Sequence, residues 1–391
     1  MNPNYSTTQF IKTVAEVAEN FGFQPTAQFK KNPACKNVAG TLSHTASAKD
    51  RKQDDTYGLL ANGLPLYTEH RLQGLSDTPI FTYSIGAVPR SNEIAIGLHV
   101  FHVKKSIAEA LLLQGLQATI RELGYENYSV RINSLGDSDS STRYHRELTN
   151  FLRKRIDHLP PAARELMKEH AHLALMHMIE KEHELALKAP SPLEYLSDSS
   201  RKHFREVIEY LDMTNTPYEI DPKLLGHHQC YSDALFAFDL YSEQDTTPLP
   251  ELHIRGGRYD VFMEQHTEEP ISAAGAVMIL KDHPLPARLP RTKAKRPKVY
   301  VIQLGFGPKM RTLALLNELR HAGIPATHRV AHDSLSEQLR DAEKLQVPYA
   351  IIIGQKEYVE GTVILRDMQA RNQETLPYDK LIRKLKRVAR S

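Results

Sequence analysis

Gly256-Gly257-Arg258-Tyr259-Asp260 places bare backbone beside a guanidinium, a phenol and a carboxylate. Glycine inside a strand usually marks a position where a ligand or another backbone must come close. Taken alone, the string also fits a tight turn with a surface ion pair. Two further segments flank it: Arg131-Ile132-Asn133-Ser134-Leu135-Gly136 lies upstream, and Ala273-Ala274-Gly275-Ala276 follows shortly after.

The end of the chain carries a second set of motifs. Short apolar strands alternate with helices after Pro297, which indicates a small parallel or mixed sheet. Within it stand Ala350-Ile351-Ile352-Ile353-Gly354-Gln355-Lys356-Glu357, then Glu360-Gly361-Thr362-Val363, then Arg366-Asp367. A glycine after a buried strand opens a loop where backbone donors and the Gln355 amide could meet RNA bases. The alternative is a generic flavodoxin-like module.

Together these motifs resemble the histidyl-tRNA synthetases, which are class II aminoacyl-tRNA synthetases. Pro192-Leu193-Glu194-Tyr195 resembles the inserted helical domain of that family. The resemblance implies an α+β class II synthetase-like core, an antiparallel sheet with helices, formed by residues 1–137 and 219–287. It also implies a helical insertion at 138–218, a proline-rich basic linker at 288–297 and an anticodon-binding-like α/β domain at 298–391.

The resemblance implies a catalytic role for Arg90, at the end of Ile85-Gly86-Ala87-Val88-Pro89-Arg90, if the protein is active. This arginine would meet the α-phosphate of ATP, and ATP with Mg²⁺ would then be the cofactors. Gly226-His227-His228-Gln229-Cys230-Tyr231 stands where the family has Arg-Gly-Leu-Asp-Tyr-Tyr, so Gly226 replaces a catalytic arginine. Gly97-Leu98-His99-Val100 and Asp282 stand where further arginines are expected. Each lost transition-state donor costs about 10²–10³ in rate, so the changes predict a loss of roughly 10⁴–10⁶.

The resemblance also implies two sets of binding residues. Substrate contacts are expected at Tyr231, Gly256, Gly257, Arg258, Tyr259 and Gly275. RNA contacts are expected at Gln355, Glu360, Arg366 and Arg296. No metal site is predicted: no two of His170, His172, His177 and His183 are spaced i, i+4, and three neighbours such as His227, His228 and Cys230 rarely point inward together.

Composition sets broad limits on function. The 391 residues carry 50 Lys+Arg against 47 Asp+Glu, a net charge of +3 that does not by itself indicate a nucleic-acid binder. Cations instead gather in the 288–298 segment and after Asp379. Two cysteines, Cys35 and Cys230, provide no disulfide framework. No signal peptide or membrane-spanning run is visible, which predicts a soluble, cytoplasmic protein.

Periodicity predicts the elements that must position these residues. An amphipathic helix is expected at 7–21, capped by Ser6 or Thr7, whereas 24–63 gives no interpretable pattern. Strands are expected at 80–85 and 97–103, paired as a hairpin around Arg90, and at 128–132, 235–240 and 252–254. Helices are expected at 107–123 and throughout 138–211, and Gly275–Leu280 should lead into another. After the linker, strands are expected at 299–303, 326–330, 349–353 and 362–365, and helices at 309–321, 335–345 and 381–388.

Three functions fit these observations. The first is a histidyl-tRNA synthetase paralogue, catalytically weakened or inactive, that still binds tRNA or a related ligand. The second is an active but divergent histidine–tRNA ligase. The third is a synthetase-like regulatory subunit of ATP phosphoribosyltransferase, a family that usually lacks the C-terminal domain. The resemblance further implies a homodimer, since class II cores normally pair about a two-fold axis.

Overall fold

The computed structural model describes residues 5–29, 63–69, 72, 78–88, 93–241, 251–268, 270–290 and 296–388. Arg90 and most of the 24–63 segment lie outside these ranges. The chain divides into two compact units. One gathers Thr26–Glu109 and Tyr125–Leu285, and the other gathers Pro3–Pro25, Ala110–Gly124 and Pro286–Ser391.

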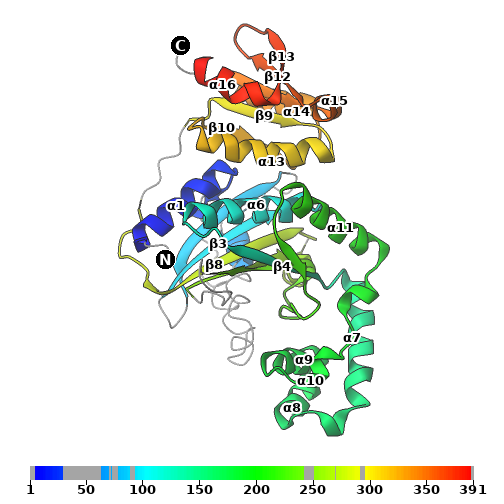
Figure 1. Cartoon of the computed structure of the whole chain (residues 1–391). Coiled ribbons are helices and arrows are strands. Elements are labelled where there is room, and N and C mark those ends of the chain that lie inside the picture. Colours follow the sequence, from blue (N-terminus) through cyan, green and yellow to red (C-terminus); the bar gives the residue numbers. More distant parts are fainter. Residues whose placement is uncertain are drawn as a thin grey trace. The chain divides into compact units, whose positions relative to one another are not determined.

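The first unit is built on a large, mainly antiparallel sheet (Figure 1). Its strands run in the order β2 (Ile80–Ala87), β3 (Glu93–Phe101), β8 (Ala273–Pro284), β7 (Leu252–Arg258), β6 (Ser232–Leu240), β4 (Tyr128–Ser134) and β5 (Tyr218–Ile220). Every ladder in this order is antiparallel except the one between β4 and β5. The α+β core and the β2–β3 hairpin are therefore confirmed.

The helical insertion leaves this sheet after β4 and returns before β5. It contains α7 (Ser138–Arg153), a 3-10 turn at Ile156–His158, α8 (Pro161–Glu169), α9 (Ala171–Glu180), α10 (Glu184–Leu187), a second 3-10 turn at Pro192–Tyr195 and α11 (Asp198–Met213). Side-chain oxygens start the long helices: Asp137 accepts from the Ser140 amide, and Ser197 accepts from the Ser200 amide. Pro161 opens α8, where its missing N–H costs nothing.

One sequence prediction in the core is wrong. Gly275–Leu280 was expected to lead into a helix, but β8 continues as a strand to Pro284. Its residues pair with β3 on one side and with β7 on the other, and the residues from Ala273 to Leu280 are all buried. Pairing on both edges outweighs the helical tendency of Ala, Met and Leu, because local propensity is a weak prior. Lys281 and Asp282 are thus strand neighbours and not helix neighbours.

The second unit contains a smaller sheet in the order β10 (Ala326–His328), β9 (Val299–Gln303), β11 (Tyr349–Ile353), β12 (Thr362–Asp367) and β13 (Gln373–Pro377). Four helices follow its strands: α13 (Phe306–His321), α14 (Leu335–Lys344), α15 (Gln355–Glu360) and α16 (Tyr378–Val388). In Figure 1, α13 and α14 lie on opposite faces of the sheet. This α/β alternation confirms the predicted C-terminal domain, with β13 as a strand that the sequence did not reveal.

Two segments from the N-terminal part of the chain belong to this second unit. They are α1 (Thr7–Asn20), capped by Ser6 and followed by the short β1 (Gln24–Pro25), and most of α6 (Ile107–Glu122). Asn20 donates to the Leu316 carbonyl of α13, and Nε2 of His328 donates to the Phe21 carbonyl at 3.0 Å. These contacts help to bury more than one face of α13.

The structure also adds short elements that were not predicted, among them β1, β5, a 3-10 turn at Thr26–Gln28, α5 (Gly63–Glu69) and α12 (Asp260–His266). None of the helices among the described residues is both long and apolar enough to cross a membrane.

Candidate functional site

The glycine pair of the sequence motif serves the sheet itself. A Cβ atom on Gly256 would lie 2.5 Å from the Gly275 carbonyl oxygen, and one on Gly257 would lie 2.7 Å from the Ala234 carbonyl oxygen. Both distances are too short for any side chain. Of the two expectations for these glycines, the close approach of another backbone is the one that the structure supports.

Arg258 is buried, with 1% of its surface exposed. Its Nε and Nη2 atoms form a bidentate pair with the Glu109 carboxylate, each at 2.8 Å. Nη1 donates to the Val103 carbonyl and to Asp260, and Nη2 also donates to the Lys105 carbonyl. The guanidinium therefore has its donors engaged inside the fold. This geometry fits a positioning role, and it excludes the surface ion pair that the string alone also allowed.

Charges around Glu109 set its ionisation. Burial alone would raise the pKa of Glu109, but the charges of Arg258 and His203 and their hydrogen bonds lower it to about 2. Burial also pulls down the pKa of His203, whose Nε2 lies 2.7 Å from Glu109, but the carboxylate outweighs burial and raises it. Glu109, Arg258 and His203 thus form a buried ionic cluster within the first unit.

Tyr259 turns to a different neighbour, His99 on β3. The Tyr259 hydroxyl and Nδ1 of His99 are 2.8 Å apart, and both side chains are fully buried. Burial lowers the pKa of His99 to about 4, so its ring is neutral at neutral pH. The first residue of α5 packs directly on the pair, because a Cβ on Gly63 would lie 2.5 Å from the Tyr259 hydroxyl.

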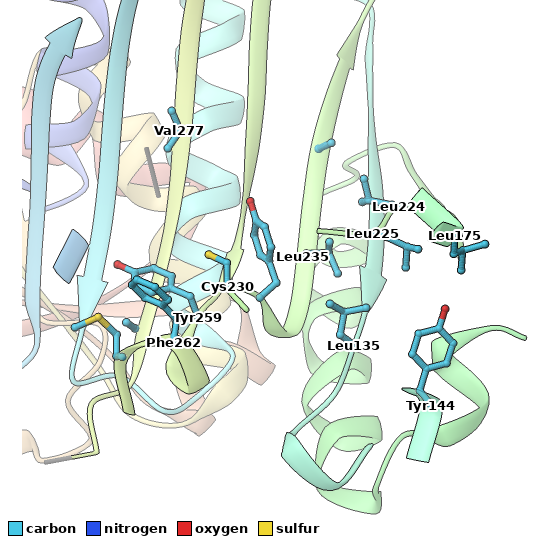
Figure 2. Close-up of a cluster of buried hydrophobic side chains, with 14 of the residues drawn as sticks. Leu135, Tyr144, Leu175, Leu224, Leu225, Cys230, Leu235, Tyr259, Phe262 and Val277 are labelled. Atoms are coloured by element: carbon cyan, nitrogen blue, oxygen red, sulfur yellow. The ribbon is translucent and has the colours of Figure 1, made fainter. Parts of the chain in front are cut away.

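Tyr231 lies in the same apolar cluster. The cluster also holds Cys230, Leu235, Tyr259, Phe262 and Val277, which Figure 2 labels. A side chain on Gly226 would overlap the Tyr231 ring. The position where the resemblance expects a catalytic arginine therefore has no room for one in this conformation.

Arg255 is a candidate site residue that the sequence reasoning missed. Its guanidinium carbon lies 5.8 Å from the centroid of the Tyr231 ring, and its Nη2 donates to the Leu225 carbonyl. Strand alternation could have revealed it, since residues 255 and 257 of a strand share one face and residue 258 lies on the other. Arg255 therefore brings a cation to the side of Tyr231.

The predicted RNA contacts fall into two groups at opposite ends of β11. Gln355 and Glu360 are exposed at the two ends of α15, which follows the carboxyl end of this strand. Arg366 pairs with Ala350, near the start of β11, and Arg296 donates to Gln346, which precedes that strand. Because a five-residue strand spans roughly 16 Å, the two groups do not form one site.

An exposed aromatic ring lies at the carboxyl edge of β9 and β11. These strands are parallel, so the loops after both end at the same edge. The Gln355 amide oxygen approaches to within 3.8 Å of a Cβ built on Gly305, and Phe306 next to it is 39% exposed. Gly307 packs closely on the Tyr358 ring and joins α13 to α15. Phe306 was not predicted, although an apolar residue after a strand-ending glycine was a visible signal.

Comparisons with known proteins agree with this geometry. Residues 298–388 match the family described as "Anticodon binding domain". The histidine–tRNA ligase of Bacillus velezensis is 26% identical over 314 residues, which cover 79% of this chain and 73% of that protein. The histidine–tRNA ligase of Thermosynechococcus vestitus is 25% identical over 313 residues, covering 78% and 71%. The crystal structure of apo S. aureus histidyl-tRNA synthetase aligns over 96% of this chain and 94% of that one, with a TM-score of 0.52 and 18% identity, and so shares its fold.

The chain is thus similar to the histidyl-tRNA synthetases over most of its length, which supports a divergent member of that family. Three of its changed motif positions have distinct surroundings. Gly226 packs on Tyr231, His99 is a buried neutral imidazole, and Asp282 is exposed near the end of β8 with a φ of 59°.

Asp282 lies far from the other expected site residues of this chain. It lies seven residues along β8 from Gly275, or roughly 20 Å. Gly275 instead pairs with His99 on β3 and with Gly257 on β7, which places these three backbones side by side. Of the expected substrate residues, the structure groups Tyr231, Tyr259 and the glycines around one buried cluster, and it separates Arg258 from them. Arg90 lies outside the described residues.

Proposed function

We propose that this protein is a histidyl-tRNA synthetase paralogue that binds tRNA or a related RNA and has lost most or all of its ability to activate histidine. The observation that carries this proposal is the chemistry around His99, Tyr231 and Tyr259. Arg255 is a cation that the described residues bring beside Tyr231, and the cluster around the two tyrosines holds apolar side chains such as Phe262 and Val277.

Activation of an amino acid needs cations because negative charge develops on the phosphates of ATP as the carboxylate attacks. Arginine binds phosphate oxygens bidentately, which a neutral imidazole cannot reproduce. The His99 imidazole is uncharged at neutral pH, and Gly226 has no side chain that could carry a charge. Each missing donor costs about 10²–10³ in rate. Arg90 and Arg255 alone would leave the reaction strongly impaired.

RNA binding is supported by the second unit. Residues 298–388 match an anticodon-binding family, and the exposed Phe306 follows Gly305, which lies near Gln355. Exposed aromatic rings stack on unpaired bases of RNA. Helix α16 adds exposed cations at Lys380, Arg383, Lys386 and Arg387.

The proposal places this protein in the cytoplasm as a homodimer. A monomer mass in sedimentation at micromolar concentration would contradict the dimer.

The activation half of the proposal is tested by histidine-dependent ATP–pyrophosphate exchange on the purified chain. We expect the wild type and Arg90→Ala to give the same background rate, with an active family member as the positive control. Strong exchange that Arg90→Ala abolishes would refute the proposal and establish an active ligase, with ATP and Mg²⁺ as its cofactors.

The RNA half is tested by filter binding of tRNA at several salt concentrations. We expect the affinity to fall steeply as salt rises, because Lys and Arg release counterions from the phosphates. Phe306→Ala should weaken binding about fivefold to a hundredfold, since one base stack is worth about 1–3 kcal/mol. Leu345→Ala, which removes another exposed apolar side chain at the end of α14, should bind as the wild type does. If the protein binds no RNA, the RNA half of the proposal is refuted, and the hypothesis of a regulatory subunit of ATP phosphoribosyltransferase remains.

A further inference from the structure

Five histidines of the described chain gather where the helical insertion meets the 224–231 loop. His145 comes from α7, His170 and His172 from the start of α9, and His227 and His228 from the loop. Four of the rings form a continuous stack. The ring centroids are 4.1 Å apart for His145 and His170, 3.9 Å for His170 and His228, and 4.7 Å for His227 and His228, with interplanar angles of 29°, 16° and 28°.

A pocket of about 220 Å³ opens beside this stack. It is larger than the ~150 Å³ cavity that holds benzene in an engineered protein. The imidazoles of His145, His170 and His228 line one part of it, and Leu135 and Leu148 line another. A flat ring therefore has both the space and the apolar contacts that it needs.

The polar groups of the pocket are uncharged. None of its lining residues is Asp, Glu, Lys or Arg. Burial, and repulsion from the neighbouring imidazoles, lowers the pKa of His170 to about 3. Burial lowers the pKa of His172 to about 4, and its Nε2 donates to the Gly226 carbonyl at 2.8 Å. A neutral lining favours a neutral ring over a phosphate or a carboxylate.

Two buried polar atoms of the pocket have no hydrogen-bond partner among the described residues. They are the hydroxyl of Tyr144, a residue only 3% exposed, and Nδ1 of His145. Buried polar groups are almost always hydrogen-bonded, so orphaned ones at a pocket point to a ligand. The phenol hydroxyl can donate to the polar edge of a heteroaromatic ring, and the imidazole nitrogen can pair with a further polar group of the same ligand.

We propose that this pocket binds a nucleobase, stacked on the outer face of His145 at the end of the imidazole stack and hydrogen-bonded at its edge by the Tyr144 hydroxyl. Bases stack on histidine and tyrosine rings in many RNA-binding proteins. A metal ion would need ring nitrogens that converge to within about 2.0–2.1 Å of one point. The parallel rings do not converge in this way, and no group of three or more His, Cys, Asp or Glu in the described part of the chain is arranged for a metal.

The base could belong to a free nucleoside or to an RNA that presents an unstacked residue. The pocket is separate from the candidate RNA surface around Phe306, so this inference does not rest on the proposed function. A free riboside tests the pocket even if the protein binds no RNA.

The experiment measures the fluorescence of 2-aminopurine, which is quenched on stacking, with the full-length protein. We expect saturable quenching of the free riboside, or of a single-stranded RNA that carries 2-aminopurine, and the responsive probe identifies the source of the base. Tyr144→Phe keeps the ring and removes the hydroxyl, so it should weaken binding about threefold to tenfold, the loss of one hydrogen bond. His145→Ala and His170→Ala should weaken binding at least as much.

His177→Ala, on α9 but outside the pocket lining, is the matched control and should bind as the wild type does. Unchanged circular dichroism and an unchanged urea midpoint would show that Tyr144→Phe is folded. The proposal fails if neither probe is quenched, or if Tyr144→Phe, His145→Ala and His170→Ala all bind like the wild type. Stoichiometric Zn²⁺ binding that His145→Ala abolishes, without any quenching, would also overturn it in favour of a metal site.

Discussion

Replacing Arg258 by methionine would leave the Glu109 carboxylate buried without its main counter-charge. Glu109 is fully buried, and its pKa falls from 4.5 to about 2 in the folded protein. Since one pKa unit corresponds to about 1.4 kcal/mol, the ionic cluster stabilises the ionised carboxylate by about 3 kcal/mol. Breaking a buried ion pair from one side typically costs about 3–5 kcal/mol. We therefore expect Arg258→Met to lower the free energy of unfolding by about 3–5 kcal/mol.

Urea unfolding at pH 7, followed by circular dichroism, measures this loss in the transition of the first unit. The double variant Glu109→Gln with Arg258→Met should recover part of the stability, because Glu109 is then neutral and only Asp260 has lost its Arg258 partner. Arg146→Met is the matched control. It removes a 72% exposed guanidinium that pairs with Glu147, and it should change the stability by less than about 1 kcal/mol.

Two results would refute this reasoning. If Arg258→Met unfolds like the Arg146→Met control, the buried pair does not stabilise the core. If the double variant is as unstable as the single one, the loss comes from packing of the Arg258 stem and not from the unpaired Glu109. A direct role in substrate binding predicts a different pattern, in which affinity falls and stability does not.

Three further outcomes follow from the same structure. Glu109 raises the pKa of His203, so the stability that protonated His203 contributes is full below about pH 6.5 and is lost as the pH rises through the folded pKa. Urea unfolding between pH 6 and 9 should therefore show a decline in stability, and His203→Gln should remove that decline. Gly257→Ala should lower the free energy of unfolding by at least about 1–3 kcal/mol, because its Cβ would clash with the Ala234 carbonyl. Thermal melting should show almost no change for the control Gly86→Ala, whose Cβ would meet nothing within 4 Å. The fragment 298–391 should fold with a dispersed NMR spectrum but melt below the whole protein, because α13 loses its packing against α1; an unfolded spectrum would refute the domain boundary.

The sequence alone predicted the helices and strands that depend on neighbouring residues along the chain. The apolar period of 3.6 residues and the Ser6 cap located α1. Alternating apolar residues located the β2–β3 hairpin, and apolar runs separated by helices located the C-terminal domain. These features arise from contacts within a few residues along the chain, so the sequence alone suffices for them.

Long-range pairing decided the rest. β8 is a strand because β3 and β7 hydrogen-bond to both of its edges, and no local pattern shows those partners. Arg258 meets Glu109 across 149 residues of chain, and His145 meets His170 and His228 only after the insertion has folded. The functional meaning of a charged or aromatic residue depends on these distant neighbours, which remove it from water, pair its charge or leave its polar atom unpartnered.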